Sequence, residues 1–180
     1  MTAGVTVKLL NSEVFDAKIK DAINQVKNLM PEFTVIANMW YKDNKQIFDL
    51  KSAGQYEDFK TGPDGKRPTK YMLYKKSKVG GAYPLLKFSG KLAASILNSG
   101  AAGAVKQISA TQLVLGTTIP YAIYHQLGTG KMPARPPIIN KESEKHGQTN
   151  IFQKRLANYM RVISASVAKR VARAVKRNGL

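Results

Sequence analysis

The stretch AVKQISATQLVLGTTI, residues 104–119, decides the fold class of this chain. Apolar residues alternate with polar ones along much of it, and Leu113 and Leu115 stand two positions apart, as on a strand with one buried face. Ser109 and Ala110 lie between the two alternating runs and suit a turn. The stretch therefore predicts a β-hairpin, and with it an α+β fold in which helices cover a small antiparallel sheet.

Helical patterns surround the predicted hairpin. Apolar side chains recur at three- and four-residue steps in four segments: residues 12–30, 91–98, 121–127 and 151–177. Residues 33–41 suit either a strand or a further N-terminal helix, and the spacing of Ile36 and Trp40 favours the helix. We expect the N-terminal helices and the long C-terminal amphipathic helix to pack on the sheet.

The domain organisation is simple, because 180 residues with 43% hydrophobic composition suffice for one core. We expect residues 1–150 to form a single α+β domain. Residues 51–82, rich in glycine and proline, predict a long surface excursion from it. Residues 151–180 predict a basic helix that belongs to the same domain or forms an arm that contacts another subunit. A location on a membrane surface is less favoured, because the apolar face has no cluster of Trp or Phe.

Positive charge dominates the composition, with 29 Lys and Arg, 11 Asp and Glu and a formal net charge of +18. Residues 1–64 hold nine of the acidic residues, whereas residues 65–141 and 151–180 hold none. Such asymmetry indicates an anionic partner, which the sequence leaves open as nucleic acid, an acidic protein surface or anionic lipid. The candidate contacts with acidic partners or DNA are Lys70, Lys75, Lys76, Lys78, Lys169, Arg170 and Arg173.

Residues 70–78 have two interpretations of equal weight. Tyr71 and Tyr74 stand among four lysines, a mixture that suits nucleic acids because lysines contact phosphates and aromatic rings stack on bases. The same mixture suits a solvated edge strand, whose lysines oppose aggregation.

Signatures of catalysis and of cofactor binding do not stand out in the sequence. There is no cysteine, and the segment GTGK at residues 128–131 fails as a phosphate-binding loop because His125 and Met132 replace the required Gly and Ser or Thr. His125 has no carboxylate near it in sequence that would orient a general base, so a structural role is favoured. The sequence shows no membrane span and no N-terminal signal segment. We expect no enzyme, no cofactor and no metal site.

Residues 83–138 carry a set of motifs in a fixed order. These motifs are YPLLKFSGKL at residues 83–92, LGT at 115–117, YAIYHQLG at 121–128 and MPARP at 132–136. In this combination the segment resembles the phage virion morphogenesis, or tail completion, family of Mu-like tailed phages. The chain departs from the family pattern at Leu127, where an aromatic residue is usual, and at Pro137, where a large apolar residue is usual.

The resemblance implies a structural role without catalysis. Proteins of this family complete the tail or join it to the head, and act as rings at the neck of the virion. The implied partners are copies of this chain, other neck, portal or tail proteins, and DNA contacted non-specifically in the channel, with no membrane. The implied location is the head–tail junction of the virion, after assembly in the host cytoplasm.

The resemblance also implies a subunit interface or structural unit formed by motif residues. These residues are Ser89, Gly90, Leu92, Tyr121, Tyr124, His125, Gly128, Pro133, Arg135 and Pro136. We expect Tyr121, Tyr124 and His125 to pack beneath the turn. Arg135 is expected to donate to carbonyls or a carboxylate, including groups of the next subunit. The alternative is a nucleic-acid-binding protein, monomeric or dimeric, that acts through residues 66–91 and 154–177. An enzymatic alternative would rest on His125 alone.

Overall fold

The computed structural model describes residues 17, 18, 20, 21, 23, 24, 27–48, 56, 69–82, 84–130, 132–141, 143 and 149–177. Its elements are, in chain order, α2 (Met30–Lys45), the 3-10 turn η1 (Gln46–Phe48), α3 (Lys70–Val79), α4 (Lys91–Leu97), β1 (Ala104–Ile108), β2 (Leu113–Thr117), α5 (Ala122–Leu127) and α6 (Thr149–Arg177). Helices combined with an antiparallel hairpin confirm the predicted α+β fold.

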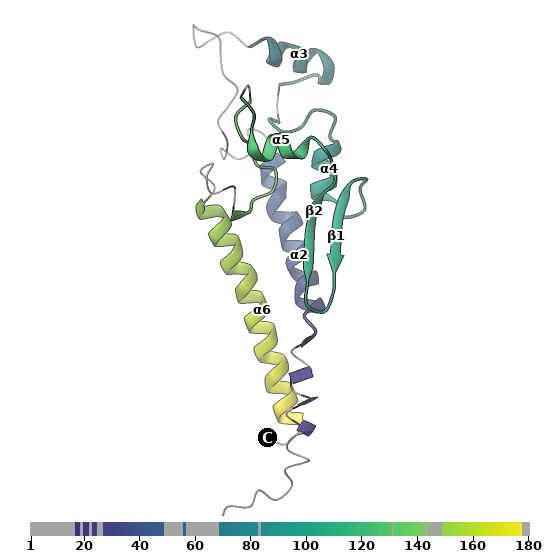
Figure 1. Ribbon diagram of the computed structural model, residues 1–180, viewed down its shortest axis with the longest axis vertical. Coiled ribbons are helices and arrows are strands. Elements are labelled where there is room, and N and C mark those ends of the chain that lie inside the picture. Colours follow the sequence, from purple (N-terminus) through teal and green to yellow (C-terminus); the bar gives the residue numbers. More distant parts are fainter. Residues whose placement is uncertain are drawn as a thin grey trace, which may run out of the picture.

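Helix α2 runs along the middle of the molecule (Figure 1). The long helix α6 lies on one side of α2 and the hairpin on the other, while α4 contacts both α2 and the hairpin. Helix α5 crosses above these elements, and α3 lies at the end of the molecule beyond α5 (Figure 1).

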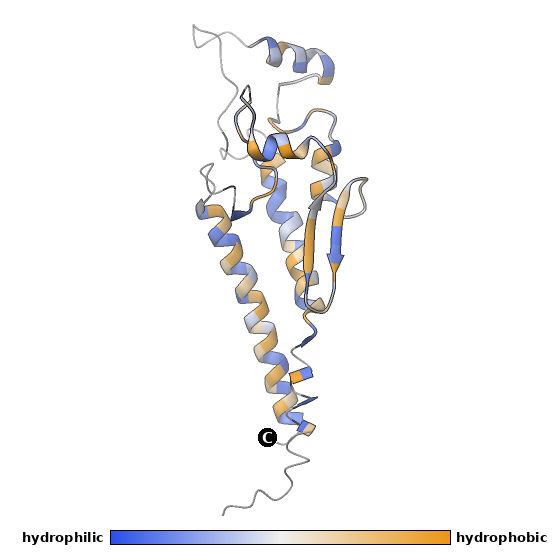
Figure 2. Cartoon of the chain, viewed as in Figure 1, coloured by the Kyte–Doolittle hydropathy of each residue, from blue (hydrophilic) through white to orange (hydrophobic). Residues whose placement is uncertain are grey.

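The hairpin of residues 104–119 is confirmed. Strands β1 and β2 pair in antiparallel register, with Lys106 opposite Leu115 at the centre. The backbone N–H of Ser109 donates to the carbonyl of Gln112 at 2.9 Å and closes the turn. Thr111 lies in the turn, and the second strand begins at Leu113. Strand β2 is the more apolar of the two (Figure 2), and Leu115 packs against the core.

Helix α2 confirms the helical interpretation of residues 33–41. The side chain of Asn28 accepts the backbone N–H of Met30 at 3.0 Å, and Pro31 follows in the first turn, where its missing N–H costs nothing. Ile36 and Trp40, spaced four positions apart, are both buried. Trp40 belongs to the main core cluster, which is formed by Trp40, Ile47, Phe48, Leu86, Leu92, Ala93, Ile96 and Ile139.

Residues 70–79 form a helix, so the edge-strand interpretation of residues 70–78 is wrong. The hydroxyl of Thr69 accepts the backbone N–H of Met72 at 3.3 Å and caps the helix N-terminus. At the other end Gly80 adopts a left-handed conformation with φ of 78°, which a glycine reaches without strain. Both end signals lie in the local sequence, at Thr69 and Gly80.

Helix α6 confirms the predicted C-terminal helix, but its predicted apolar face is only partly covered. Phe152 and Tyr159 pack against the core, whereas Leu156 is 41% exposed. Arg155 and Ala174 are its buried residues among those that the structure describes.

Two expected features lie largely outside the described residues. Of the predicted helix over residues 12–30, the described positions up to residue 27 are helical, namely 17, 18, 20, 21, 23, 24 and 27. Of the predicted excursion over residues 51–82, residues 51–55 and 57–68 are not among those described.

Candidate functional site

The segment that follows α5 folds back against this helix. Gly128 ends α5 with φ of 74°, and a Cβ atom at this position would lie 2.7 Å from the backbone nitrogen of Ala134. Only glycine allows this approach of the two backbones. The backbone N–H of Arg135 then donates to the carbonyl of His125 at 2.8 Å. The motif residues 121–128 and 132–136 thus form one connected unit.

Further hydrogen bonds hold this unit in place. The amide of Gln126 donates to the carbonyl of Ile138 at 2.9 Å and accepts the backbone N–H of the same residue at 3.3 Å. The hydroxyl of Tyr56 donates to the carbonyl of Pro136. Pro136 itself is buried. The side chains of Gln126 and Tyr56 thus satisfy backbone groups of residues 136 and 138 and hold the segment in place.

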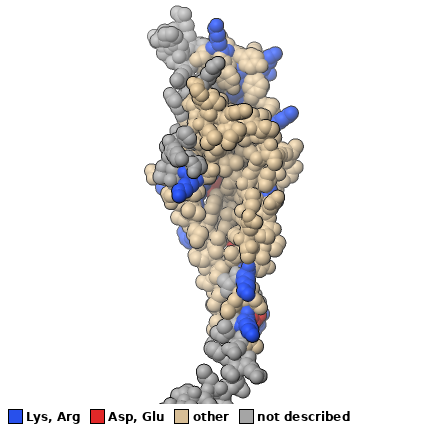
Figure 3. Space-filling model, viewed as in Figure 1, with Lys and Arg blue, Asp and Glu red and all other residues tan. Residues whose placement is uncertain are grey.

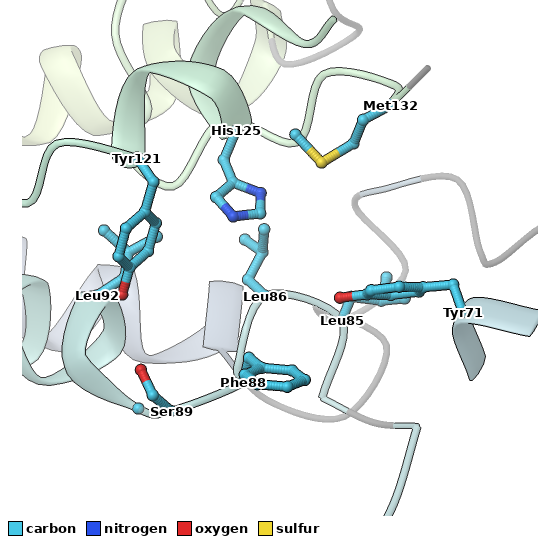
Figure 4. A pocket seen from close by; sticks show the side chains of 10 residues that line it. Tyr71, Leu85, Leu86, Phe88, Ser89, Leu92, Tyr121, His125 and Met132 are labelled. Carbon is cyan, nitrogen blue, oxygen red and sulfur yellow. The ribbon is translucent and has the colours of Figure 1, made fainter. Parts of the chain in front are cut away.

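A pocket of about 390 Å³ lies beside α5 (Figure 4). Its lining joins α3, the loop that precedes α4, the start of α5 and the loop after α5, through Tyr71, Leu85, Leu86, Phe88, Ser89, Gly90, Leu92, Tyr121, His125 and Met132. Five of the residues selected from the motifs, Ser89, Gly90, Leu92, Tyr121 and His125, therefore meet around one pocket although they come from separate segments.

His125 presents its imidazole ring to this pocket (Figure 4). The ring lies edge-on to that of Tyr121, with 6.3 Å between the centroids. Burial lowers the pKa of His125, and the positive charges of Arg135 and Lys75 lower this pKa further. The imidazole is therefore neutral at pH 7. Its Nδ1 atom is buried and has no hydrogen-bond partner among the described residues.

The aromatic side chains of the motif do not all pack beneath the turn. Tyr124 is 57% exposed, so the expectation of packing is wrong for this residue. Tyr121 lines the pocket and is 38% exposed, so the expectation of packing beneath the turn is not met there either. Helix α5 has no buried residue, because Ile123, Tyr124 and Leu127 all point outward. A six-residue helix cannot turn all of its apolar side chains toward one core.

Arg135 is 7% exposed, so its side chain is buried in the interior of the chain. Pro133 beside it is half-buried. This position makes a bond from Arg135 to a neighbouring subunit difficult. A substitution of Arg135 by Ala is therefore expected to affect folding as well as assembly.

The candidate basic contacts differ in exposure, and five of the seven are exposed. Lys70, Lys76 and Lys78 on α3 and Lys169 and Arg173 on α6 are exposed. On the face shown in Figure 3, Lys and Arg side chains gather near α3 and near the C-terminal end of α6.

The prediction that Lys75 contacts an acidic partner or DNA is wrong, because this residue is fully buried. Its ammonium group donates to the carbonyls of Pro84 and Leu85. Burial lowers the pKa of Lys75 to about 8, with a smaller contribution from the charge of Arg135. Which of the four lysines points inward depends on the contact of α3 with the loop at residues 84–85, and the sequence does not show this contact.

Arg170 was also predicted as a contact with acidic partners or DNA, but its guanidinium is engaged within the chain. Its guanidinium lies 3.2 Å from the buried carboxylate of Glu32 and donates to the carbonyl of Asn28 at 2.7 Å. Arg170 thus holds α6 against α2 and is not a free surface cation. The sequence did not indicate this pair, because its members are far apart in the chain and only the fold brings them together.

Several pocket residues were not selected from the sequence. Tyr71 reaches the pocket from α3, Phe88 and Leu86 come from the loop before α4, and Met132 comes from the loop after α5. Leu86 and Phe88 lie inside the motif at residues 83–92 and Met132 inside that at 132–136, which is the local signal that could have indicated them; Tyr71 lies outside all of the motifs.

The remaining findings concern metals, membranes and relatives. In the part of the chain that the structure describes, no three His, Asp or Glu side chains lie close enough to share a metal ion. None of the described helices has both the length and the hydropathy of a membrane-spanning segment. No family model, curated protein or solved structure matches this chain.

Proposed function

We propose that this chain is a structural virion protein of a tailed phage, a ring-forming component of the neck that completes the tail or joins it to the head. The observation that carries the proposal is the convergence of the motif segments. Of the four motif segments that carry the resemblance, those at residues 83–92, 121–128 and 132–136 contribute residues to one pocket or support it, whereas residues 115–117 lie in β2. Motifs that lie apart in a sequence yet form one unit are what a shared fold and role would produce.

The outer surface of this unit supports a role in assembly. Ile123, Tyr124 and Leu127 expose apolar or aromatic surface on α5. Aromatic side chains are enriched at protein interfaces because they bury large areas at a low entropic cost. A surface of this composition is expected to become covered in an assembled particle.

The charge distribution supports docking to acidic neighbours. Lys70, Lys76 and Lys78 are exposed on α3, which lies beyond α5 at the end of the molecule (Figure 1). Non-specific contacts with phosphates would grip DNA and hinder its passage through a neck channel. We therefore assign most of these charges to docking on acidic partners, with DNA contacts as the lesser use.

The proposal is tested in the phage genome that encodes the chain. Disruption of the gene is expected to give complete heads and complete tails that do not join, and a plasmid-borne copy should restore joined particles. Antibody labelling of intact virions should place the chain at the head–tail junction. Normal, joined particles without the protein would overturn the proposal.

A nucleic-acid-binding function is the second candidate, and the exposed face of α3 favours it. Tyr71 and Tyr74 are about half exposed and lie among exposed lysines, an arrangement that can stack bases and contact phosphates. This candidate predicts tight binding of the isolated chain to short single-stranded DNA, with a steep loss of affinity as salt rises. The neck role predicts only weak binding of this kind at physiological salt.

A further inference from the structure

A hollow of about 260 Å³ lies beside the C-terminal part of α6, at the end of the molecule opposite α3 (Figure 1). Among the described residues it is lined by Arg170, Arg173, Ala174 and Arg177, and we call it the arginine hollow. Arginines that are three and four positions apart lie on the same side of a helix, so α6 brings three guanidinium groups to one space. Ala174 is small and buried, so the arginines supply the polar part of this lining.

Two of the three guanidinium groups are held by neighbouring groups. Nη1 of Arg170 donates to the carbonyl of Asn28 at 2.7 Å, and its Nη2 lies 3.2 Å from the carboxylate of Glu32. Nη2 of Arg177 donates to the carboxylate of Asp21 at 2.9 Å. An arginine loses rotamer entropy when it is fixed on a ligand, so groups that are already held bind a ligand at a lower entropic cost.

The guanidinium of Arg170 has donors that the surrounding protein does not use. Its Nε and Nη2 atoms are buried, and among the described residues neither has an acceptor in hydrogen-bond geometry. The contact of Nη2 with Glu32 is therefore an ion pair without a hydrogen bond. Leaving a buried donor of a charged group unpaired costs free energy. Such donors on a residue that lines a hollow indicate a ligand that accepts hydrogen bonds.

The charges around the arginine hollow favour an anion. Its three guanidinium groups contact two carboxylates, and Lys169 and Lys176 are exposed on the same part of α6, which contains no Asp or Glu. The dipole of α6 opposes an anion at its C-terminal end, but this partial charge is only about half an elementary charge and acts within the last turn. The excess of formal positive charge therefore outweighs the dipole.

The number of donors favours a phosphate group over a carboxylate. A guanidinium is a planar fork that binds either group through a pair of parallel hydrogen bonds. One fork occupies both oxygens of a carboxylate. Free phosphate and phosphate monoesters have at least three terminal oxygens in a tetrahedral arrangement, so they can accept from several guanidinium groups at once. A phosphodiester, as in the backbone of DNA, has only two such oxygens and suits the arginine hollow less well.

We propose that the arginine hollow is a binding site for a phosphate group with at least three terminal oxygens, either free phosphate or a phosphate monoester. Arg170 and Arg177 form its two held sides. Arg173 stands between them in the chain and is exposed, so it contacts the ligand without a role in the fold. The site goes beyond the proposed function and does not depend on it, because it lies at the end of the molecule opposite α3 (Figure 1).

Calorimetric titration of the purified full-length chain with inorganic phosphate, in chloride buffer at constant ionic strength, tests the site. We expect saturable binding of one phosphate per chain. Arg173→Gln should bind phosphate at least about tenfold more weakly, because it loses a charged fork. Arg161→Gln is the matched control, since it removes the same charge from another exposed position on α6. Circular dichroism should show that both variants fold. No saturable binding, or equal weakening in both variants, would overturn the proposal.

A conservative variant separates the guanidinium fork from its charge. Arg173→Lys keeps the net charge and should still bind phosphate more weakly than the wild type does. Phosphate should also raise the melting temperature of the wild type more than that of Arg173→Gln, because a ligand that binds only the folded chain stabilises it. Wild-type affinity in Arg173→Lys would show that charge alone determines binding, and it would overturn a site built from forks.

Two further probes identify the source of the phosphate group. Adenosine monophosphate that binds more tightly than inorganic phosphate, with the same dependence on Arg173, would identify a phosphate monoester. Equal binding of the two would identify phosphate itself. A short DNA duplex without terminal phosphates that depends on Arg173 and binds more tightly than either probe would overturn the proposal in favour of a phosphodiester contact. None of these results alters the proposed function, which gene disruption tests separately.

Discussion

Arg155 of α6 donates a hydrogen bond from Nη1 to the side-chain oxygen of Asn44 on α2, across 2.8 Å and within the protein interior. Its Nη2 donates to the carbonyl of Asp43 at 2.6 Å, and the hydroxyl of Tyr159 donates to the Asp43 carboxylate at 3.0 Å. Nearer the other end of α6, Ser166 donates to the buried carboxylate of Glu32 at 2.6 Å. Two polar clusters, rather than a continuous apolar seam, thus hold α6 on α2.

The first prediction concerns the cluster at Arg155. Arg155→Met should lower the free energy of unfolding by about 2–3 kcal/mol, because the buried side chain of Asn44 loses its charged donor. Arg161→Met, an exposed arginine on the same helix, should change stability by less than about 0.5 kcal/mol. Urea unfolding followed by circular dichroism measures both. Equal effects for the two variants would show that the cluster does not hold the helices together.

The second prediction concerns the return of the chain at Gly128. Gly128→Ala should destabilise the protein by about 2 kcal/mol or more, because φ of 74° with extended ψ strains an alanine and the new Cβ meets the backbone of Ala134. Gly130→Ala is the matched control, since no atom lies within 4 Å of its added Cβ. Thermal unfolding of the two variants checks the difference. A Gly128 variant as stable as the Gly130 variant would contradict the structure of this turn.

The third prediction follows from the buried amine of Lys75. Its pKa is lowered to about 8 in the folded chain, against an ordinary value of 10.5, chiefly by burial. Between these values the unfolded chain binds more protons than the folded chain, so stability rises with pH from about 8 toward 10.5. Lys75→Met should remove this rise.

The measurement is the free energy of unfolding at intervals from pH 7 to pH 9.5. Higher values are unsuitable, because burial raises the pKa values of Tyr56 and Tyr159 in the folded state. Above about pH 10 these tyrosines ionise first in the unfolded chain, which lowers stability. An identical pH profile for the wild type and Lys75→Met would refute the role of the amine.

The sequence predicts those features of the fold that depend on local patterns. The alternation at residues 104–119 gives the hairpin, and the period of residues 151–177 gives α6, because each pattern records which face is buried. Of the ten residues selected from the motif segments, five line the pocket, although the sequence predicted no pocket there. The direction of Lys75 and the pair of Glu32 with Arg170 depend on contacts between distant segments, and no local pattern contains them.

The candidate site is less predictable than the fold for the same reason. Tyr71 joins the pocket because a Thr cap and a Gly cap make residues 70–79 a helix. The mixture of Tyr and Lys in residues 70–78 suits a strand as well as a surface that contacts nucleic acid, so the sequence analysis did not predict this helix. Exposure of Tyr124 also depends on the whole fold, because a short helix has more apolar side chains than the adjoining core can receive.

The last prediction concerns the exposed lysines of α3 in the assembling phage. Lys70, Lys76 and Lys78 should be replaced by Gln together, and Lys75 should be kept because it is buried. If these charges dock acidic neighbours, heads and tails should accumulate unjoined, and the defect should grow as salt rises in an in vitro joining assay, because salt screens the remaining attraction.

A matched control removes the same number of charges elsewhere. Lys42, Lys45 and Lys106 are exposed on α2 and β1, so their replacement by Gln lowers the net charge equally without touching α3. This control should join heads to tails normally. Particles of the α3 variant that join normally but lose DNA, or eject it abnormally, would instead assign the lysines to the channel. The comparison therefore separates docking at a specific face from a general effect of charge, because only the former depends on where the three lysines stand.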